Sequence, residues 1–331
     1  MEFKELFIGL SENKSLNALA KKYGLLFGAK SVVGGENIPD TVETIKKLNA
    51  QGIEATVDNL GEFVDTKEIA DRELIIILNM IDAIQEHNLK AHMSIKLTQL
   101  GLEFDKKYAM ENLRKILLKA SKTNMHINID TESYRTLADI QSMLDEVKHE
   151  FSNVGTVIQC YLYDAEKMIE KYPDLRLRLV KGAYSEDDTI SFQSKEDIDE
   201  NYIKMIKKRL LNANNITSIA THDHNIINEI KQFVKDHDID KDQFEFQMLY
   251  GFRTEMHKAL VDEGYNFCVY IPFGKDWFAY FMRRLAERPQ NLDLVIKSFV
   301  KKDTVIKVGS AVGLVALSGY AMKKVLDKKD Q

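Results

Sequence analysis

The chain has 331 residues, a formal net charge of −5 and 44% hydrophobic residues, which is enough to bury a large core in one large domain or two small ones. The mildly acidic balance, without basic clusters, argues against nucleic acid as the main partner. The two cysteines, Cys160 and Cys268, each lie within an apolar run and indicate buried thiols in a reducing compartment, not a disulfide framework.

The first residues lack the charged-then-apolar layout of a signal peptide, and no apolar run reaches the roughly 18 residues of a membrane-spanning helix. We therefore expect a cytoplasmic protein. Residues 1 to about 50 are predicted to be helical. Apolar residues recur at helical spacing from Ser15 to Gly28, and Pro39 and Thr41 begin a second helix that ends near Gly52.

Eight short runs rich in Val, Ile and Phe follow, and longer amphipathic stretches separate them. The runs are Ile53–Asp58, Ala91–Leu97, Met125–Asp130, Gly155–Gln159, Leu175–Lys181, Thr217–His222, Phe244–Leu249 and Asn266–Ile271. The helix candidates include Ala70–His87, Tyr108–Ala120, Ser133–Phe151, Asp199–Asn212 and Asn225–His237. Eight strand-then-helix units over about 235 residues match an α/β fold of the (β/α)₈ TIM-type barrel in number and size. A doubly wound open sheet is the alternative fold.

Polar or ionisable residues end all eight runs. They are Asp58, Lys96, Asp130, Gln159, Arg178 with Lys181, His222 with Asp223, Gln247 and Tyr270. In a barrel these side chains meet at the C-terminal rim, where they suit an anionic ligand and a buried carboxylate. The last run is expected to stop at Pro272 and Gly274.

A helix predicted over residues 276–287 follows the last run directly. Within it, Tyr280 and Arg284 are four residues apart, as are Arg283 and Glu287, so all four lie on neighbouring rows of one face. Two adjacent arginines with a tyrosine can clamp a small carboxylate, and Glu287 can fix one guanidinium. A solvated helix face with an ion pair is the alternative interpretation.

Sequence motifs for other kinds of site are absent or weak. No GxGxxG follows a predicted strand, and no Walker loop is present. His222 and His224 form an HxH at a strand end, but the other histidines lie mostly in helix candidates or strand starts, so we expect no metal. Lys96 and Lys181 are candidates for a Schiff-base lysine, for phosphate binding or for pairing with a carboxylate. A metal hydrolase or a Schiff-base lyase using His222 or Lys181 therefore remains the alternative, and a non-enzymatic ligand-binding barrel is a third.

Several short segments, taken in order along the chain, resemble the proline dehydrogenase family, and specifically its one-function bacterial type. They are Ser94–Leu97, Ile129–Glu132, Arg176–Tyr184, Ala220–His222, Phe244–Leu249 and Tyr280–Glu287. The resemblance covers roughly residues 50–290 and implies an FAD-dependent enzyme on a (β/α)₈ barrel. It implies oxidation of L-proline to Δ1-pyrroline-5-carboxylate, the first step of proline degradation to glutamate, with electrons passed to a quinone.

The resemblance also implies roles for individual residues. The expected proline site is formed by Lys96, Asp130, Leu249, Tyr270, Tyr280, Arg283 and Arg284. In it the two arginines hold the carboxylate with help from Lys96, and the tyrosines and Leu249 enclose the ring. Asp130 is expected to organise Lys96 and Tyr270. Tyr270 stands where relatives that prefer 4-hydroxyproline carry a smaller residue, so it points to proline itself.

The cofactor site is expected on the same rim. Arg178 is expected near flavin N5, and the other residues expected to line the FAD are Gln159, Lys181, Gly182, Ala183, Thr221 and His222. Gly182 is expected to allow close approach of the backbone to the cofactor. Two features depart from the family pattern: Asp223 stands where Asn is frequent, and the loop over 275–277 is short.

The character of the chain changes after Lys301. Residues 308–322 carry no charge, and Gly309 and Gly313 have the spacing of closely packed helices. We expect a helix packed on the barrel or on the N-terminal helices, with peripheral contact to the inner face of the cell membrane as the alternative. The expected division is 1–52 N-terminal helices, 53–290 catalytic barrel and 291–331 helical tail.

Overall fold

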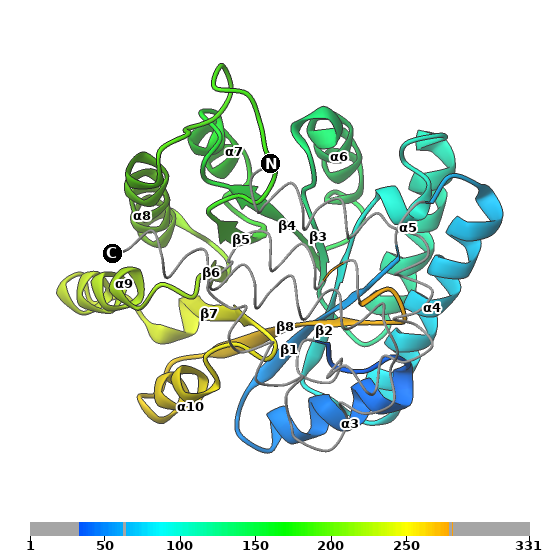
Figure 1. Cartoon of the computed structure of the whole chain (residues 1–331), viewed down its shortest axis with the longest axis horizontal. Coiled ribbons are helices and arrows are strands. Elements are labelled where there is room, and N and C mark those ends of the chain that lie inside the picture. The colour runs from blue at the N-terminus through cyan, green and yellow to red at the C-terminus, as the bar shows by residue number, and fades with distance from the viewer. Residues whose placement is uncertain (1–32, 62–63, 278–279, 281–331) are drawn as a thin grey trace, which may run out of the picture. The chain divides into compact units, whose positions relative to one another are not determined.

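The computed structural model describes residues 33–61, 64–277 and 280, and its central feature is a closed barrel of parallel strands (Figure 1). The strands are β1 Glu54–Asn59, β2 Ala91–Ile95, β3 Ile127–Ile129, β4 Val154–Gln159, β5 Arg176–Val180, β6 Thr217–Ala220, β7 Phe244–Leu249 and β8 Phe267–Phe273. Each strand pairs with the next in parallel, and β8 pairs with β1 to close the sheet. The predicted (β/α)₈ barrel is confirmed, and the open sheet is excluded.

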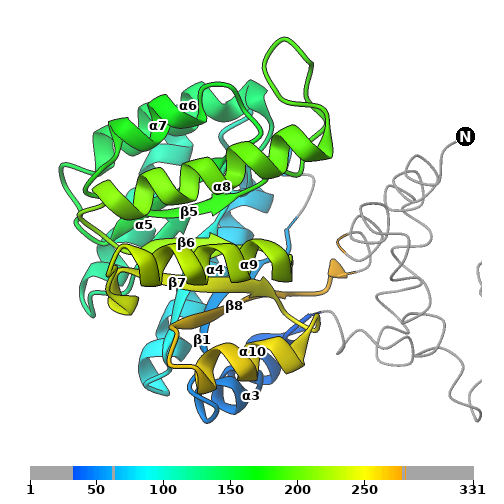
Figure 2. The same cartoon turned by 90° about the vertical axis from the view of Figure 1, so that its left-hand side faces the viewer.

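Helices surround the strands, as the two views show (Figures 1 and 2). They are α3 Ile38–Asn49, α4 Lys67–Glu86, α5 Lys106–Ser121, α6 Tyr134–Val147, α7 Ala165–Lys171, α8 Lys195–Asn212, α9 His224–Asp236 and α10 Thr254–Asp262, with short 3₁₀ turns η3 Thr98–Leu100 and η4 Lys241–Gln243. Side chains of Thr66, Asp105 and Ser194 accept hydrogen bonds from backbone N–H groups in the first turns of α4, α5 and α8. None of the helices formed by the described residues is both long and apolar enough to cross a membrane.

Alternation along the strands sorts the side chains between the barrel lumen and the helices. In β5, Leu177 and Leu179 are fully buried in the hydrophobic core, while Arg176 and Arg178 bond to side chains on other strands inside the barrel. Successive side chains of a strand point to opposite faces, so arginines at every second position share the lumen. The sequence of β5 thus places two positive charges inside the barrel.

The predicted end of the last strand was wrong by two residues. β8 continues through Pro272 to Phe273, and Pro272 is in register with Asp58 of β1. Proline has no N–H to donate, but β7 has already ended at Leu249, so the missing donor removes no bond of the ladder. The strand ends instead at Gly274, whose φ of +125° suits glycine.

The compact unit that contains the barrel runs from Val33 to Gly274. The predicted second helix before the barrel is α3, which packs against β1 and α4 and buries Ile45. Lys275–Trp277 and Tyr280 fall in a separate unit. The predicted helices over 15–28 and 281–287, and the tail over 291–331, lie outside the described residues.

Candidate active site

Asp130 is the centre of a group of buried polar side chains in the lumen. It follows β3 directly, and its Oδ1 accepts hydrogen bonds from Ser94 Oγ at 2.6 Å, Asn128 Nδ2 at 3.0 Å and Arg178 Nη1 at 2.9 Å. Its Oδ2 accepts a further bond from Tyr270 Oη at 3.1 Å. The Asp130 carboxylate is therefore held by donors from four strands.

Lys96 lies closer to Asp58 than to Asp130. Its Nζ is 2.7 Å from Asp58 Oδ2, 3.4 Å from Tyr270 Oη and 3.6 Å from Asp130 Oδ2. Asp58 lies near the end of β1, and only 3% of its side chain is exposed. Asp58, Lys96, Asp130, Arg178 and Tyr270 are called the lumen cluster below.

The environment of the lumen cluster fixes its protonation states. Burial would lower the pKa of Lys96, but the carboxylates of Asp58 and Asp130 outweigh burial and raise that pKa. Burial would raise the pKa of Asp130, but the charges of Arg178 and Lys96, with the hydrogen bonds it accepts, lower it. Burial raises the pKa of Asp58, although Lys96 opposes that rise. Burial and the charge of Asp130 raise the pKa of Tyr270 well above its ordinary value. Near neutral pH Lys96 is thus an ammonium, and Tyr270 is a neutral phenol.

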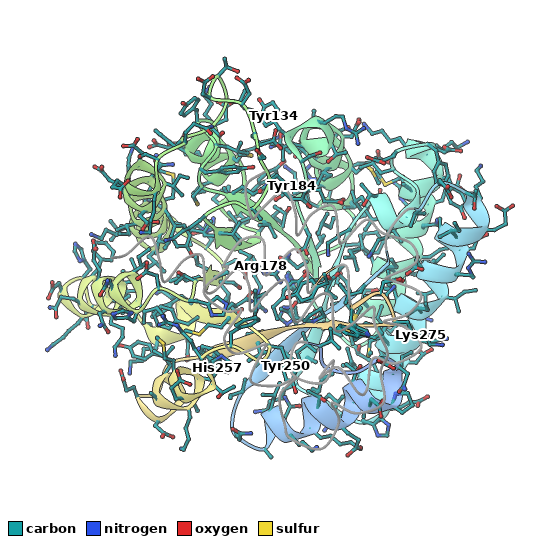
Figure 3. The ribbon with its side chains drawn as sticks, in the orientation of Figure 1. Tyr134, Arg178, Tyr184, Tyr250, His257 and Lys275 are labelled. Atoms are coloured by element: carbon teal, nitrogen blue, oxygen red, sulfur yellow. The ribbon has the colours of Figure 1, made fainter. Side chains whose placement is uncertain are left out.

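Arg178 crosses the lumen from β5 to β1 and lies toward the centre of the ring of strands (Figure 3). Its Nη2 donates to Thr56 Oγ1 at 3.1 Å, and its guanidinium carbon lies 5.2 Å from the centroid of the Tyr270 ring. Its Nε–H is buried and meets no acceptor among the residues that the structure describes. A buried donor without an acceptor is costly, so this N–H marks a place where a ligand acceptor would be stabilised.

A second ion pair lies one layer deeper in the lumen. Arg176 Nη2 is 2.7 Å from Glu245 Oε1, which also accepts hydrogen bonds from Ser218 Oγ at 2.6 Å and Gln247 Nε2 at 2.5 Å. Burial would raise the pKa of Glu245, but the charge of Arg176 and these hydrogen bonds lower it. Arg176 therefore already has its own carboxylate partner.

The residues predicted to line the cofactor follow three neighbouring strands, β4, β5 and β6. Gln159 ends β4, and its Nε2 donates to the backbone oxygen of Glu132 at 2.8 Å. Lys181 follows β5, forms an ion pair with Asp199 and lies 3.6 Å from Asp223 Oδ2. These residues gather on one side of the rim, next to the lumen cluster residue Arg178.

Thr221 and His222 follow β6 and join it to α9. Thr221 Oγ1 accepts a hydrogen bond from the N–H of Asp223 at 3.1 Å, and Asp223 Oδ1 accepts one from Asn225 N at 3.0 Å as the cap of α9. Asp and Asn cap helices about equally well, so the departure at this position keeps the cap. His222 Nε2 accepts a hydrogen bond from Leu249 N at 3.2 Å.

Gly182 has a reason to be glycine that involves no ligand. Its φ is +128°, and a Cβ at this position would collide with the ring of Tyr161. The neighbouring Ala183 is exposed.

The remaining predicted site residues divide between the barrel and the rest of the chain. Leu249 ends β7 in register with Tyr270 of β8. The side chain of Tyr280 is buried, and this residue belongs to the separate unit. Arg283, Arg284 and Glu287 lie outside the described residues.

Comparison with known proteins identifies the family. A family model described as proline dehydrogenase matches residues 41–296. Proline dehydrogenases 1 and 2 of Bacillus subtilis strain 168 are 44% and 42% identical to the chain over 301 residues, which cover 90% of this chain and 99% of each relative. The chain belongs to the proline dehydrogenase family. The proline dehydrogenase of Deinococcus radiodurans is 36% identical over 310 residues, which cover 90% of this chain and 98% of the relative.

Solved structures show the same barrel within larger proteins. Proline utilization A from Bdellovibrio bacteriovorus, inactivated by N-propargylglycine, matches with a TM-score of 0.75 and 22% identity over 91% of this chain and 38% of that chain. A variant of proline utilization A from Bradyrhizobium japonicum matches with a TM-score of 0.67 and 22% identity over 82% of this chain and 32% of that chain. At these identities the likeness concerns the fold alone.

Proline dehydrogenases use FAD, and the chemistry of this rim fits that cofactor. The buried Nε–H of Arg178 offers a charged donor without an acceptor among the described residues, as a flavin ring nitrogen would require. Lys181 adds a cation suited to phosphate, and Gln159 and Thr221 add neutral polar groups on the adjacent strand ends.

Some polar residues of the site were not assigned from the sequence. The sequence marks Asp58 only as a strand end and Ser94 only as part of a family segment, and it assigns no role to Thr56 or Asn128. Each of the last three precedes a polar strand end by two residues, so it faces the same side of its strand. A polar residue two positions before a polar strand end was the signal that could have identified them.

The alternative enzyme classes gain no support. Among residues 33–61, 64–277 and 280, no group of three or more His, Cys, Asp or Glu side chains is arranged to hold a metal ion. Lys181 forms an ion pair with Asp199. The pKa of Lys96 is raised, so Lys96 does not present the neutral amine that Schiff-base formation needs. Membership of the proline dehydrogenase family favours neither a barrel hydrolase nor a lyase.

Proposed function

We propose that this protein is an FAD-dependent proline dehydrogenase that oxidises L-proline to Δ1-pyrroline-5-carboxylate, the first step of proline degradation to glutamate. The observation that carries the proposal is the family match over residues 41–296, with 44% identity to a proline dehydrogenase that aligns over 99% of its own length. The buried charges of the lumen cluster support it, because they suit a small zwitterion enclosed in a barrel.

The described residues bind and orient the substrate in this proposal. Bound FAD supplies the hydride acceptor. The Lys96 ammonium keeps one N–H on Asp58 and has two further donors that can turn toward a carboxylate. Leu249 and Tyr270 lie side by side in register and enclose the ring, which excludes water and opposes larger or hydroxylated rings. Asp130 holds the Tyr270 hydroxyl, so the position of the phenol ring is fixed before proline enters.

Two arginines complete the proline site in this proposal. Arg283 and Arg284 hold the carboxylate as paired, charge-assisted donors, Glu287 orients one of them, and Tyr280 encloses the ring. The support is the spacing of these residues on the predicted helix, which places all four on one face.

The cofactor is assigned to the side of the rim formed by the ends of β4, β5 and β6. Arg178 would donate to the flavin ring the Nε–H that meets no acceptor among the described residues. The other lining residues would be Gln159, Lys181, Gly182, Ala183, Thr221 and His222. For Arg178 the support is a buried donor that no acceptor in the described part of the chain meets, and for Lys181 it is the positive charge at the end of β5.

We further propose a quinone as the electron acceptor. We also propose that the chain divides into N-terminal helices over 1–52, a catalytic barrel over 53–290 and a helical tail over 291–331. For residues 308–322 we still expect a helix packed on the protein. As the alternative, peripheral membrane contact through this uncharged segment would bring the enzyme to a lipid-soluble acceptor. A protein truncated at Lys301 should then lose its association with liposomes. Equal association of the truncated and full-length proteins would refute the contact.

The test of the function is a visible spectrum followed by anaerobic addition of L-proline, with D-proline as the control. We expect a yellow protein that L-proline bleaches and D-proline does not. A yellow protein that L-proline leaves unchanged would refute the substrate but keep the flavin. A colourless protein that also fails to take up added FAD would refute the function.

A further inference from the structure

His222 takes the place of a backbone carbonyl at the end of the β6–β7 ladder. The two strands are in register up to Ala220 and Gln247, and the next bond runs from Thr221 N to Gln247 O at 3.1 Å. In a regular parallel ladder the N–H of Leu249 would then donate to the carbonyl of Thr221. Instead, Leu249 N donates to Nε2 of His222 at 3.2 Å.

This bond determines which ring nitrogen of His222 carries the proton. A nitrogen that accepts a hydrogen bond must have a free lone pair, so Nε2 is unprotonated. In the neutral imidazole the proton is therefore on Nδ1, which is a donor. The two ring nitrogens thus have different roles: Nε2 accepts a hydrogen bond from the β7 backbone, and Nδ1 carries an N–H.

Leu249 belongs to the lumen face of β7. Glu245 and Gln247 lie inside the barrel, where they bond to each other, and Leu249 is the next residue in the same alternation. On its far side the chain is tied to β8, because Tyr250 N donates to Tyr270 O at 2.9 Å. The end of β7 is therefore fixed by β8 on one side and by the His222 imidazole on the other.

We propose that His222 is a positioning residue for the substrate wall, in addition to its proposed place beside the cofactor. By accepting the Leu249 N–H, it holds the end of β7 so that the Leu249 side chain lies against the substrate ring next to Tyr270. This inference rests on the proposed function, because that function makes Leu249 and Tyr270 the wall around proline. The His222 imidazole would then contact both the proposed cofactor site and, through the Leu249 N–H, the proposed wall of the proline site.

The test compares His222→Gln with His222→Asn. Both variants lose the imidazole, but the longer Gln side chain can place an amide oxygen near the position of Nε2, whereas Asn reaches only as far as Nδ1. After flavin content is matched, we expect the KM for L-proline to be roughly three- to tenfold higher in His222→Asn than in His222→Gln, with a similar kcat, as the loss of one hydrogen bond predicts. Combining His222→Asn with Leu249→Ala should raise KM by less than the product of the two separate effects.

Two measurements on the flavin-free protein test the bond without catalysis. Nitrogen-15 NMR of histidine-labelled protein should show His222 with an unprotonated Nε2 and a protonated Nδ1. Hydrogen exchange of the Leu249 amide should be faster in His222→Asn than in His222→Gln. A protonated Nε2, equal exchange in the two variants, or equal KM values would each overturn the inference while leaving the proposed function intact. A wild-type flavoprotein that L-proline does not reduce would overturn the proposed function, and with it the assignment of Leu249 to the proline wall.

Discussion

Asp58→Asn tests whether the contact between Lys96 and Asp58 organises the lumen cluster. The two charged atoms are 2.7 Å apart, and the side chains are 3% exposed for Asp58 and 26% exposed for Lys96. Removing one partner of a buried ion pair costs about 3–5 kcal/mol, because the other charge is left without compensation. Lys96 keeps Asp130 at 3.6 Å, which compensates part of the loss. We therefore expect the free energy of unfolding to fall by about 2–4 kcal/mol.

A double-mutant cycle measured by equilibrium denaturation separates the pair from its surroundings. Asp58→Asn, Lys96→Met and the double variant are compared with the wild type. In the Lys96→Met variant, the Asp58 carboxylate no longer has an ammonium partner. Asp58→Asn should therefore lower the free energy of unfolding much less in this variant than in the wild type. We expect a coupling free energy of about 2 kcal/mol between the two residues.

The exposed pair Lys106–Asp139 provides a matched control. It has the same 2.7 Å separation, but 45% and 52% of its side chains are exposed. Asp139→Asn should change the free energy of unfolding by less than about 1 kcal/mol, as surface pairs generally do. If the effects of Asp58→Asn and Lys96→Met simply add, the two charges do not hold each other and the reasoning fails.

Three further changes test other parts of the site. Asp130→Asn should lower the free energy of unfolding by about 3–5 kcal/mol and slow proline oxidation, because four donors lose their charged acceptor; a variant with full activity and normal stability would contradict this. Arg283→Met and Arg284→Met should each weaken proline binding by about 2–5 kcal/mol, and unchanged proline saturation in both would refute the clamp. Burial lowers the pKa of His92 well below 6.5, so below that pH the unfolded chain binds a proton that the folded protein does not. The free energy of unfolding therefore has its full value above pH 6.5 and falls as the pH is lowered, by up to about 1.4 kcal/mol per pH unit. His92→Gln should flatten this slope in denaturation experiments between about pH 6.5 and 5, and an unchanged slope would refute the prediction.

The barrel could be predicted because its pattern is repeated eight times. Each short apolar run is too weak to identify a strand alone, but eight runs separated by amphipathic stretches fit few other folds. The run Phe244–Leu249 matches β7 at both ends, and most other predicted strands differ by one or two residues at each end. Strand ends vary most because they depend on the neighbour, as the continuation of β8 through Pro272 illustrates.

The partners of the site residues could not be predicted to the same depth. The sequence places Lys96, Asp58 and Asp130 at strand ends, but it does not say which carboxylate the ammonium approaches. That choice depends on the strand register and on competing donors: Asp130 is already bound by four side chains, whereas Asp58 Oδ2 is available to Lys96. Arg178 poses the same difficulty, because its bond to Thr56 joins residues that are distant in sequence and meet only across the closed lumen.

The charge balance of the lumen cluster favours the proposed carboxylate clamp over binding of the carboxylate by the cluster alone. Asp58 and Asp130 face Lys96 and Arg178, so two negative charges meet two positive ones. The deeper Arg176 is already paired with Glu245, which leaves no further cation in these two layers of the described lumen. A proline whose amine has lost its proton for oxidation would bring a third negative charge to a site where an uncompensated buried charge is strongly unfavourable. In the function proposed above, Arg283 and Arg284 supply that positive charge.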